Sequence, residues 1–148
     1  MANPDGMVVQ EFQSGRQLLG RLPYGADLVT TVENFCVENQ IAMAMFTVIG
    51  AVSSVTLGAY DQNQQVYVTF KKKGHFEIVH CTGNISIRDE TPTMHAHGVF
   101  ADMDGKTFGG HVFSKTTIYA AEMFLRELQG KPLVREYNEQ TGLYLWQQ

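Results

Sequence analysis

Cysteine, proline and long apolar runs are all scarce in this sequence. Two cysteines and four prolines occur among 148 residues, so a disulfide framework is not expected and reduced thiols are the default state. No apolar run approaches the roughly 20 residues that a membrane-spanning helix needs. Residues 1–11 lack the charged and apolar regions of a secretory signal. We therefore expect a cytoplasmic protein that does not enter a membrane.

Positive charge is also in short supply. Eleven Lys and Arg residues face fifteen Asp and Glu residues, which gives a formal net charge of −4. Proteins that hold nucleic acid mainly by neutralising phosphates usually carry a basic surface. The net charge therefore predicts DNA binding that is weak and independent of sequence. In addition, no GxGxxG or GxxxxGK[ST] pattern occurs, so the usual dinucleotide and phosphate sites are not expected.

Two segments have apolar residues at helical spacing. The first covers residues 27–39 and begins at Asp27, which is a suitable N-cap residue. The second covers residues 115–129, between Ser114 and Gly130. Strand-like runs rich in Val, Ile, Thr, Phe and Tyr are expected over residues 7–12, 17–22, 43–49, 53–60, 66–71, 76–88 and 95–102, with a last pair within residues 133–146.

The order of these segments predicts an α+β fold with a mainly antiparallel sheet and two main helices, because the strands are grouped between the helices. The length fits one domain with a core of its own. We expect residues 1–14 to be a flexible lead-in and residues 15–148 to form the domain.

Three histidines near residue 100 give the clearest chemical signal. His95 and His97 are two residues apart on a strand-like run, so their side chains point to the same face. The following turn, Met103-Asp104-Gly105, suits a three-residue hairpin loop with a bulge. That loop places His111 directly opposite His97, with His95 diagonal to it. The three imidazoles then converge on a divalent metal ion, with zinc as the best match.

This arrangement depends on the register of the hairpin. A two-residue Asp104-Gly105 loop would place His111 on the other face of the sheet. A bulge at Gly109-Gly110 would also move it. Ordinary hydrogen-bonded histidines on a half-buried sheet face are the competing interpretation. If a metal is bound, its affinity should fall below about pH 6, where imidazoles with the ordinary pKa of about 6.5 take up protons.

Other candidate residues carry weaker signals. Three consecutive lysines, at 71–73, are typical of a solvated turn but can also contact phosphate. Glu77 is a candidate general base only if it lies near the metal. His75 and His80 are expected on opposite faces of one strand, with one of them packed inside. Cys36 is expected to be a small buried apolar residue on the first helix.

Several segments together resemble the PPC domain, the plants-and-prokaryotes-conserved domain that is also called the AT-hook-associated domain. The segments that carry the resemblance are LPYGADL at residues 22–28, IGAV at 49–52, GHFEIV at 74–79, HAH at 95–97 and FGGH at 108–111. The likeness extends over roughly residues 15–147. Each motif alone is weak, but their order is specific.

The resemblance implies a curved, mostly antiparallel sheet flanked by helices, and a homotrimer. It also implies a stand-alone prokaryotic member with a candidate DNA-binding or regulatory role and a metal at His95, His97 and His111. Contacts with a protein partner are implied for the segment Gly74, His75, Phe76, Glu77, Ile78 and Val79. The chain departs from the plant form because it has no Arg-Gly-Arg-Pro hook for the DNA minor groove, and because His75 replaces a typical arginine.

Two functions of different classes therefore stay open from the sequence. The first is a trimeric regulatory module that binds a protein or DNA partner. The second is a metal-dependent enzyme or small-molecule-binding protein in which the ion polarises an oxygen or activates water. The sequence indicates neither a substrate nor a reaction.

Overall fold

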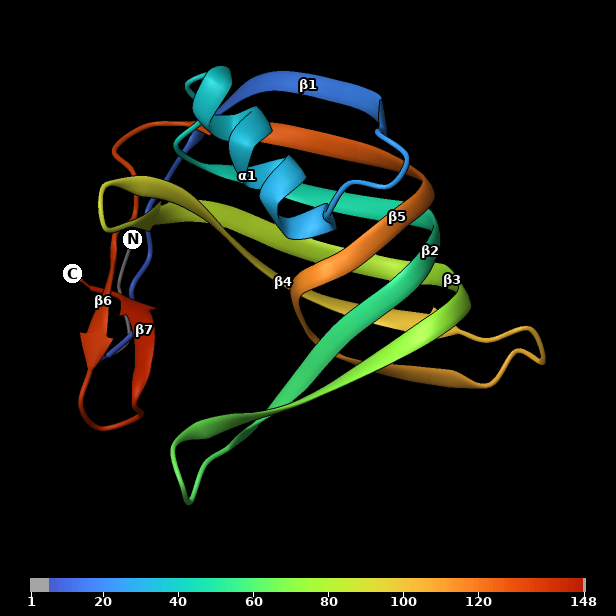
Figure 1. The fold of residues 1–148 in the computed structure, drawn as a ribbon. Coiled ribbons are helices and arrows are strands. Elements are labelled where there is room, and N and C mark those ends of the chain that lie inside the picture. Colours follow the sequence, from blue (N-terminus) through green and yellow to red (C-terminus); the bar gives the residue numbers. More distant parts are fainter. Residues whose placement is uncertain (1–5, 148) are drawn as a thin grey trace.

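Most of the chain forms one antiparallel sheet that curls back on itself (Figure 1). The computed structural model describes residues 6–147. Its elements, in chain order, are β1 (Gln13–Leu22), α1 (Leu28–Glu38), β2 (Ala44–Asp61), β3 (Val66–Arg88), β4 (Thr91–Ala101), β5 (Thr107–Gln129), β6 (Arg135–Asn138) and β7 (Leu143–Trp146). In the described part of the chain, no helix is long and apolar enough to cross a membrane.

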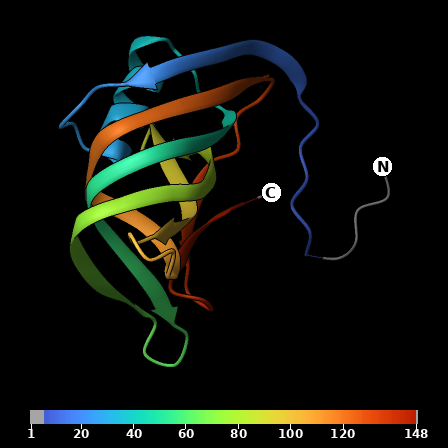
Figure 2. The same ribbon diagram turned by 90° about the vertical axis from the view of Figure 1, so that its right-hand side faces the viewer.

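The sheet closes through its longest strands. Its order is β1-β5-β2-β3-β4, and β4 pairs in addition with the first residues of β5. The 23-residue strand β5 therefore joins both ends of the β2-β3-β4 layer, which gives the strongly curved shape seen from the side in Figure 2. Register shifts in the β2–β3 pairing, between Val48 and Gly50 and between Val52 and Ser54, mark bulges that bend these long strands.

The helix covers the inner side of the curved sheet near β4 and β5 (Figure 1). Its N-cap is Asp27, as the sequence predicts; one carboxylate oxygen accepts a hydrogen bond from the Thr30 amide at 3.1 Å. The other oxygen accepts one from the Thr116 amide at 2.8 Å, so the cap also fixes the helix to β5. Glu33 accepts a hydrogen bond from the Met94 amide at 2.9 Å, which ties the helix to the strand that carries His95.

The second predicted helix is wrong, because residues 115–129 belong to β5. From Ala121 to Glu127, every second residue is buried, which is the period of a strand. Phe124, an apolar residue between two of these buried positions, faces outward. Glu127 occupies an inward position where the sequence shows a charge. Its carboxylate accepts a hydrogen bond from Arg16 at 2.7 Å. The charge of Glu127 interrupts the alternation of apolar and polar residues, and its partner, 111 residues away, cannot be recognised from the local sequence.

The other strand predictions are mostly confirmed. The predicted runs at 43–49 and 53–60 merge into β2, and those at 66–71 and 76–88 merge into β3. The predicted pair at the C-terminus is β6 and β7. Residues 7–12, in contrast, form no strand. The fold is thus mostly antiparallel β with one described helix, where the sequence predicted two.

The β4–β5 hairpin has the three-residue loop and the register that the sequence predicts. The Asp102 amide donates to the Lys106 carbonyl at 3.1 Å, and Gly105 takes a left-handed conformation with φ of 77°. The pairing then runs without a shift from Ala101 opposite Thr107 to His97 opposite His111. The two-residue loop and a bulge at Gly109-Gly110 within this pairing are therefore excluded.

Candidate metal centre

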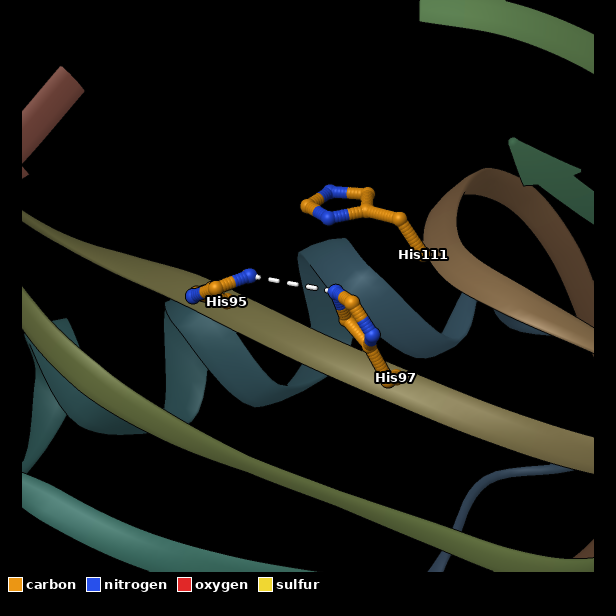
Figure 3. A group of neighbouring side chains, drawn as sticks. All are labelled: His95, His97 and His111. Carbon is orange, nitrogen blue, oxygen red and sulfur yellow. Dashed lines mark hydrogen bonds between the residues drawn. The ribbon is translucent and has the colours of Figure 1, made fainter. Parts of the chain in front are cut away.

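The three histidines meet on one face of the β4–β5 hairpin. Figure 3 shows His95 and His97 rising from β4 and His111 from β5, with their rings turned toward one another. One ligand nitrogen from each residue lies within 4.8 Å of the others. The ring centroids are 5.2 to 5.4 Å apart. The sequence-based placement of these side chains is confirmed.

The spacing suits a metal ion with tetrahedral geometry. The Nε2 atoms of His95 and His97 are 3.3 Å apart. Zn–N bonds of about 2.0–2.1 Å in a tetrahedron place neighbouring nitrogens about 3.3–3.4 Å apart. Imidazole nitrogen is a preferred ligand for zinc and neighbouring divalent transition metals. The donor set and its geometry therefore fit such an ion, and a modest closure of the three rings would complete the site.

Two further side chains contact nitrogens of the histidine rings. The Tyr67 hydroxyl lies 3.4 Å from Nδ1 of His111, and the Tyr67 ring packs on that imidazole with centroids 4.9 Å apart. The Arg135 guanidinium lies 3.5 Å from Nδ1 of His95. Contacts of this kind hold imidazoles in position and influence which ring nitrogen carries the proton.

The environment keeps two of the imidazoles neutral. Burial lowers the pKa of His95 to about 4, and the Arg135 and His97 charges act in the same direction. Burial lowers the pKa of His111 to about 4 as well, with smaller contributions from His95, His97 and Arg135. The ordinary pKa near 6.5 that we assumed from the sequence is therefore wrong for these two residues. At neutral pH both are in the uncharged form that binds a metal.

A cavity of about 310 Å³ lies next to His95 and His111. Its other walls come from β3, β4, β5 and the C-terminal hairpin. The residues that line it are Tyr67, Arg88, Thr93, Met94, His95, His111, Phe113, Arg135, Leu143, Tyr144 and Leu145. Tyr67, Arg88 and Arg135 are not predicted as site residues from the sequence. No local motif marks them, since Arg135 is 40 residues from His95 in the chain.

The remaining sequence candidates lie elsewhere. His75 and Glu77 border a separate cavity with Asp102, so Glu77 is not grouped with the histidines as a candidate base. His75 and His80 are both exposed, whereas one was expected inside. Cys36 is fully buried on α1, as predicted. Both Cys36 and Cys81 are free, and burial raises the pKa of each thiol to about 12.

Comparison with protein families decides the relationship of this chain. The model of the Plants and Prokaryotes Conserved (PCC) domain matches residues 9–129. The chain belongs to this family, the PPC domain family. The resemblance inferred from the sequence is thereby confirmed. The match ends before the β6–β7 hairpin and Arg135. Among functionally curated proteins, no match is found.

Solved structures support the same assignment. A metal-containing protein from Archaeoglobus fulgidus is 41% identical, with a TM-score of 0.92 over 96% of this chain and 100% of its own. A PPC protein from Pyrococcus horikoshii is 34% identical, with a TM-score of 0.91 over 96% and 98%. A protein from Bacteroides thetaiotaomicron, named as a candidate DNA-binding protein, shares the fold at 24% identity and a TM-score of 0.82, over 92% and 96%.

The low pKa of His95 and His111 predicts an acid-sensitive stability for the metal-free protein. In the unfolded chain these imidazoles take up protons near their ordinary pKa of about 6.5, whereas in the folded chain they do so only near 4. Between these values the unfolded state binds more protons, so the free energy of unfolding should fall as the pH is lowered from 6.5 toward 4. Urea denaturation after chelator treatment measures this slope. His111→Gln should make it shallower, and the exposed control His80→Gln should leave it unchanged. Equal slopes in all three proteins would contradict the prediction.

Proposed function

We propose that this PPC-domain protein binds a divalent metal ion, zinc being the best match, through His95, His97 and His111. We further propose that the metal presents its remaining coordination position to a small ligand. The observation that carries the proposal is the convergence of three imidazole nitrogens within 4.8 Å on one sheet face. The name of the Archaeoglobus fulgidus relative, a metal-containing protein, supports it.

A site with three protein ligands resembles a catalytic zinc site, because structural zinc sites have four protein ligands and no open coordination position. A zinc ion held in this way would polarise a ligand oxygen or activate water. The cavity that adjoins the histidines would give a ligand room to approach. No Asp or Glu lines this cavity among residues 6–147.

Zinc binding should depend on each of the three histidines. Replacing any one of them with alanine should lower the zinc affinity at least about 100-fold, because removal of a ligand exceeds the 10- to 100-fold cost of losing an outer partner. Isothermal titration calorimetry on the chelator-treated protein at pH 7.5 measures this loss. His80→Ala, an exposed histidine outside the cluster, is the matched control. Undiminished affinity in a cluster variant, or an equal loss in His80→Ala, would contradict the proposed site.

We also propose that the protein is a homotrimer, as the family resemblance implies. An apolar patch on the outer face of β1, β2 and β5 supports assembly. Leu19 pairs with Phe124, and Phe124 pairs with Thr47, which lies between Met45 and Ile49 on the same face. Leu19 is 80% exposed and Ile49 is 56% exposed in the single chain. Apolar groups of this size on an edge strand and its neighbours are typical of a surface that a partner covers.

Assembly can be measured directly by light scattering coupled to size-exclusion chromatography. We expect a mass of three chains at micromolar concentration. Leu19→Lys should shift the mass toward the single chain, because it places a charge in the apolar patch. Gln64→Lys, exposed in the turn between β2 and β3, is the control for added charge and should leave the mass unchanged. A single-chain mass for the unmodified protein would refute the trimer.

Nucleic acid is a second candidate partner, supported by the name of the Bacteroides thetaiotaomicron protein. In this chain the lysines at 71–73 are all exposed on β3 and could contact phosphates. The adjoining segment that the resemblance links to partner contacts, Gly74 to Val79, lies on the same strand. The net charge of −4 opposes tight binding.

We expect DNA binding to be weak and insensitive to sequence. Fluorescence anisotropy with an AT-rich duplex and a GC-rich duplex of equal length, titrated with salt, tests this. The affinities for the two duplexes should be equal and should fall steeply as salt rises, because phosphate contacts release counterions. Replacing Lys71, Lys72 and Lys73 with glutamine should abolish the residual binding. Tight and sequence-selective binding at physiological salt would contradict the expectation.

A further inference from the structure

The cavity beside the histidines contains positive charge without a matching negative charge. The two charged side chains that line it are Arg88 and Arg135. Arg88 has an exposed ion pair with Asp89, at 3.5 Å. Arg135 forms no ion pair within residues 6–147. A half-buried cation without an anion is costly unless its hydrogen bonds are satisfied, which makes Arg135 the notable residue.

Neutral groups hold the Arg135 guanidinium in place. Its Nε donates to the Ser86 hydroxyl at 2.8 Å, and its Nη2 donates to the Asn84 side-chain carbonyl at 3.0 Å. Its Nη1 donates to the Tyr144 carbonyl at 3.3 Å. The Trp146 indole also donates to Ser86, at 3.0 Å, and its ring lies 4.8 Å from the guanidinium. The side chain is therefore fixed at the edge of the cavity, although its charge is not neutralised.

A metal at the histidines would make the positive charge larger. Three neutral imidazoles leave the charge of a divalent ion unbalanced. In addition, the contact between Arg135 and Nδ1 of His95 requires that nitrogen to accept, since a guanidinium has only donors. If Nε2 of His95 binds the metal, Nδ1 carries the proton and can no longer accept from Arg135. One N–H group of Arg135 then lacks an acceptor and lies near the divalent metal ion. An anion could accept a hydrogen bond from this N–H group and also balance the charge of the metal.

The rest of the cavity is apolar and aromatic. Phe113 packs against both His111, at a centroid distance of 4.5 Å, and Tyr67, at 5.1 Å. Leu143 and Leu145 of the C-terminal hairpin also line the cavity. A volume of about 310 Å³ is at the lower end of the range of small-molecule sites. These walls favour a ligand that has an apolar body in addition to its charge.

We propose that this cavity binds a small organic carboxylate, with its charged end between Arg135 and the metal position and its apolar body against Phe113 and the leucines. The proposal rests on the proposed function, because the second positive charge is that of the metal. Carboxylate and phosphate both match an arginine guanidinium, and the small volume of about 310 Å³ favours the smaller carboxylate. The positive metal attracts the carboxylate, and the negative carboxylate attracts the metal. Each should therefore raise the affinity of the protein for the other by the same factor.

The test measures the zinc affinity of the chelator-treated full chain by calorimetry, with three added probes. Benzoate carries both charge and a ring, benzamide carries the ring without the charge, and sulfate carries charge without a ring. We expect saturating benzoate to raise the zinc affinity about tenfold, which is a typical coupling between two ligands. Benzamide and sulfate should have little effect.

Variants at Arg135 test the assigned residue. In Arg135→Gln, the zinc affinity measured with saturating benzoate should equal the affinity measured without it, because the charge that binds the carboxylate has been removed. Arg21→Gln, on β1 and outside the cavity, should keep the benzoate enhancement. If Arg135→Gln does not fold, Arg135→Lys replaces it, and the enhancement should decrease because the fork is lost.

Each result is decisive. Zinc binding without any effect of benzoate in the unmodified protein would overturn this inference and leave the proposed metal site intact. An effect of sulfate as large as that of benzoate would overturn the carboxylate assignment, and an enhancement that persists in Arg135→Gln would overturn the role of Arg135. If the unmodified protein binds no zinc, the proposed function fails and the inference fails with it.

Discussion

The register of the β4–β5 hairpin is the constraint on which the candidate site depends. The Asp102 carboxylate accepts hydrogen bonds from the amides of Asp104 and Lys106, at 3.1 and 2.9 Å, and so fixes a three-residue loop. Side chains alternate between the two faces of a strand, so a slip of one residue would move His111 to the opposite face. The same pairing closes the sheet, since it joins β4 to the strand that already pairs with β1 and β2. The same strand pairing therefore closes the sheet and brings the three histidines together.

The features that the sequence predicts correctly are local. The α1 cap at Asp27 and the hairpin loop at Gly105 depend on residues a few positions apart, so their patterns are visible in the chain itself. The three histidines belong to this class, because the loop length determines which residues of the two strands face each other. The resemblance to the PPC domain adds the overall fold but not the cavity.

The features that the sequence does not reveal depend on distant partners. The stretch from 115 to 129 is rich in Ala, Leu, Glu, Met and Arg, which favour helices. It is a strand because β1 and β2 pair with its two edges, and these pairings outweigh the intrinsic preference. Glu127 is buried only because Arg16 reaches it from β1. In the same way, Arg135 becomes a site residue through Ser86 and Asn84 of β3, about 50 residues away.

The candidate site draws its parts from two structural sources. The metal donors are on β4 and β5, in the closed sheet, where backbone hydrogen bonds on both sides hold their positions. Arg135, Leu143 and Leu145 come from the C-terminal hairpin. This hairpin is held against β3 by the Arg135 contacts and by the Trp146 indole, which donates to Ser86, and against β2 by the Tyr60 hydroxyl, which donates to the Thr141 carbonyl at 2.7 Å. That hairpin lies beyond the segment that the family model matches. The sheet thus supplies a rigid arrangement of ligands, and the hairpin supplies the shape and charge of the cavity. A change at Leu143 or Leu145 would alter which ligand fits and leave the backbone positions of the histidines unchanged, because the pairing of β4 with β3 and β5 fixes those positions.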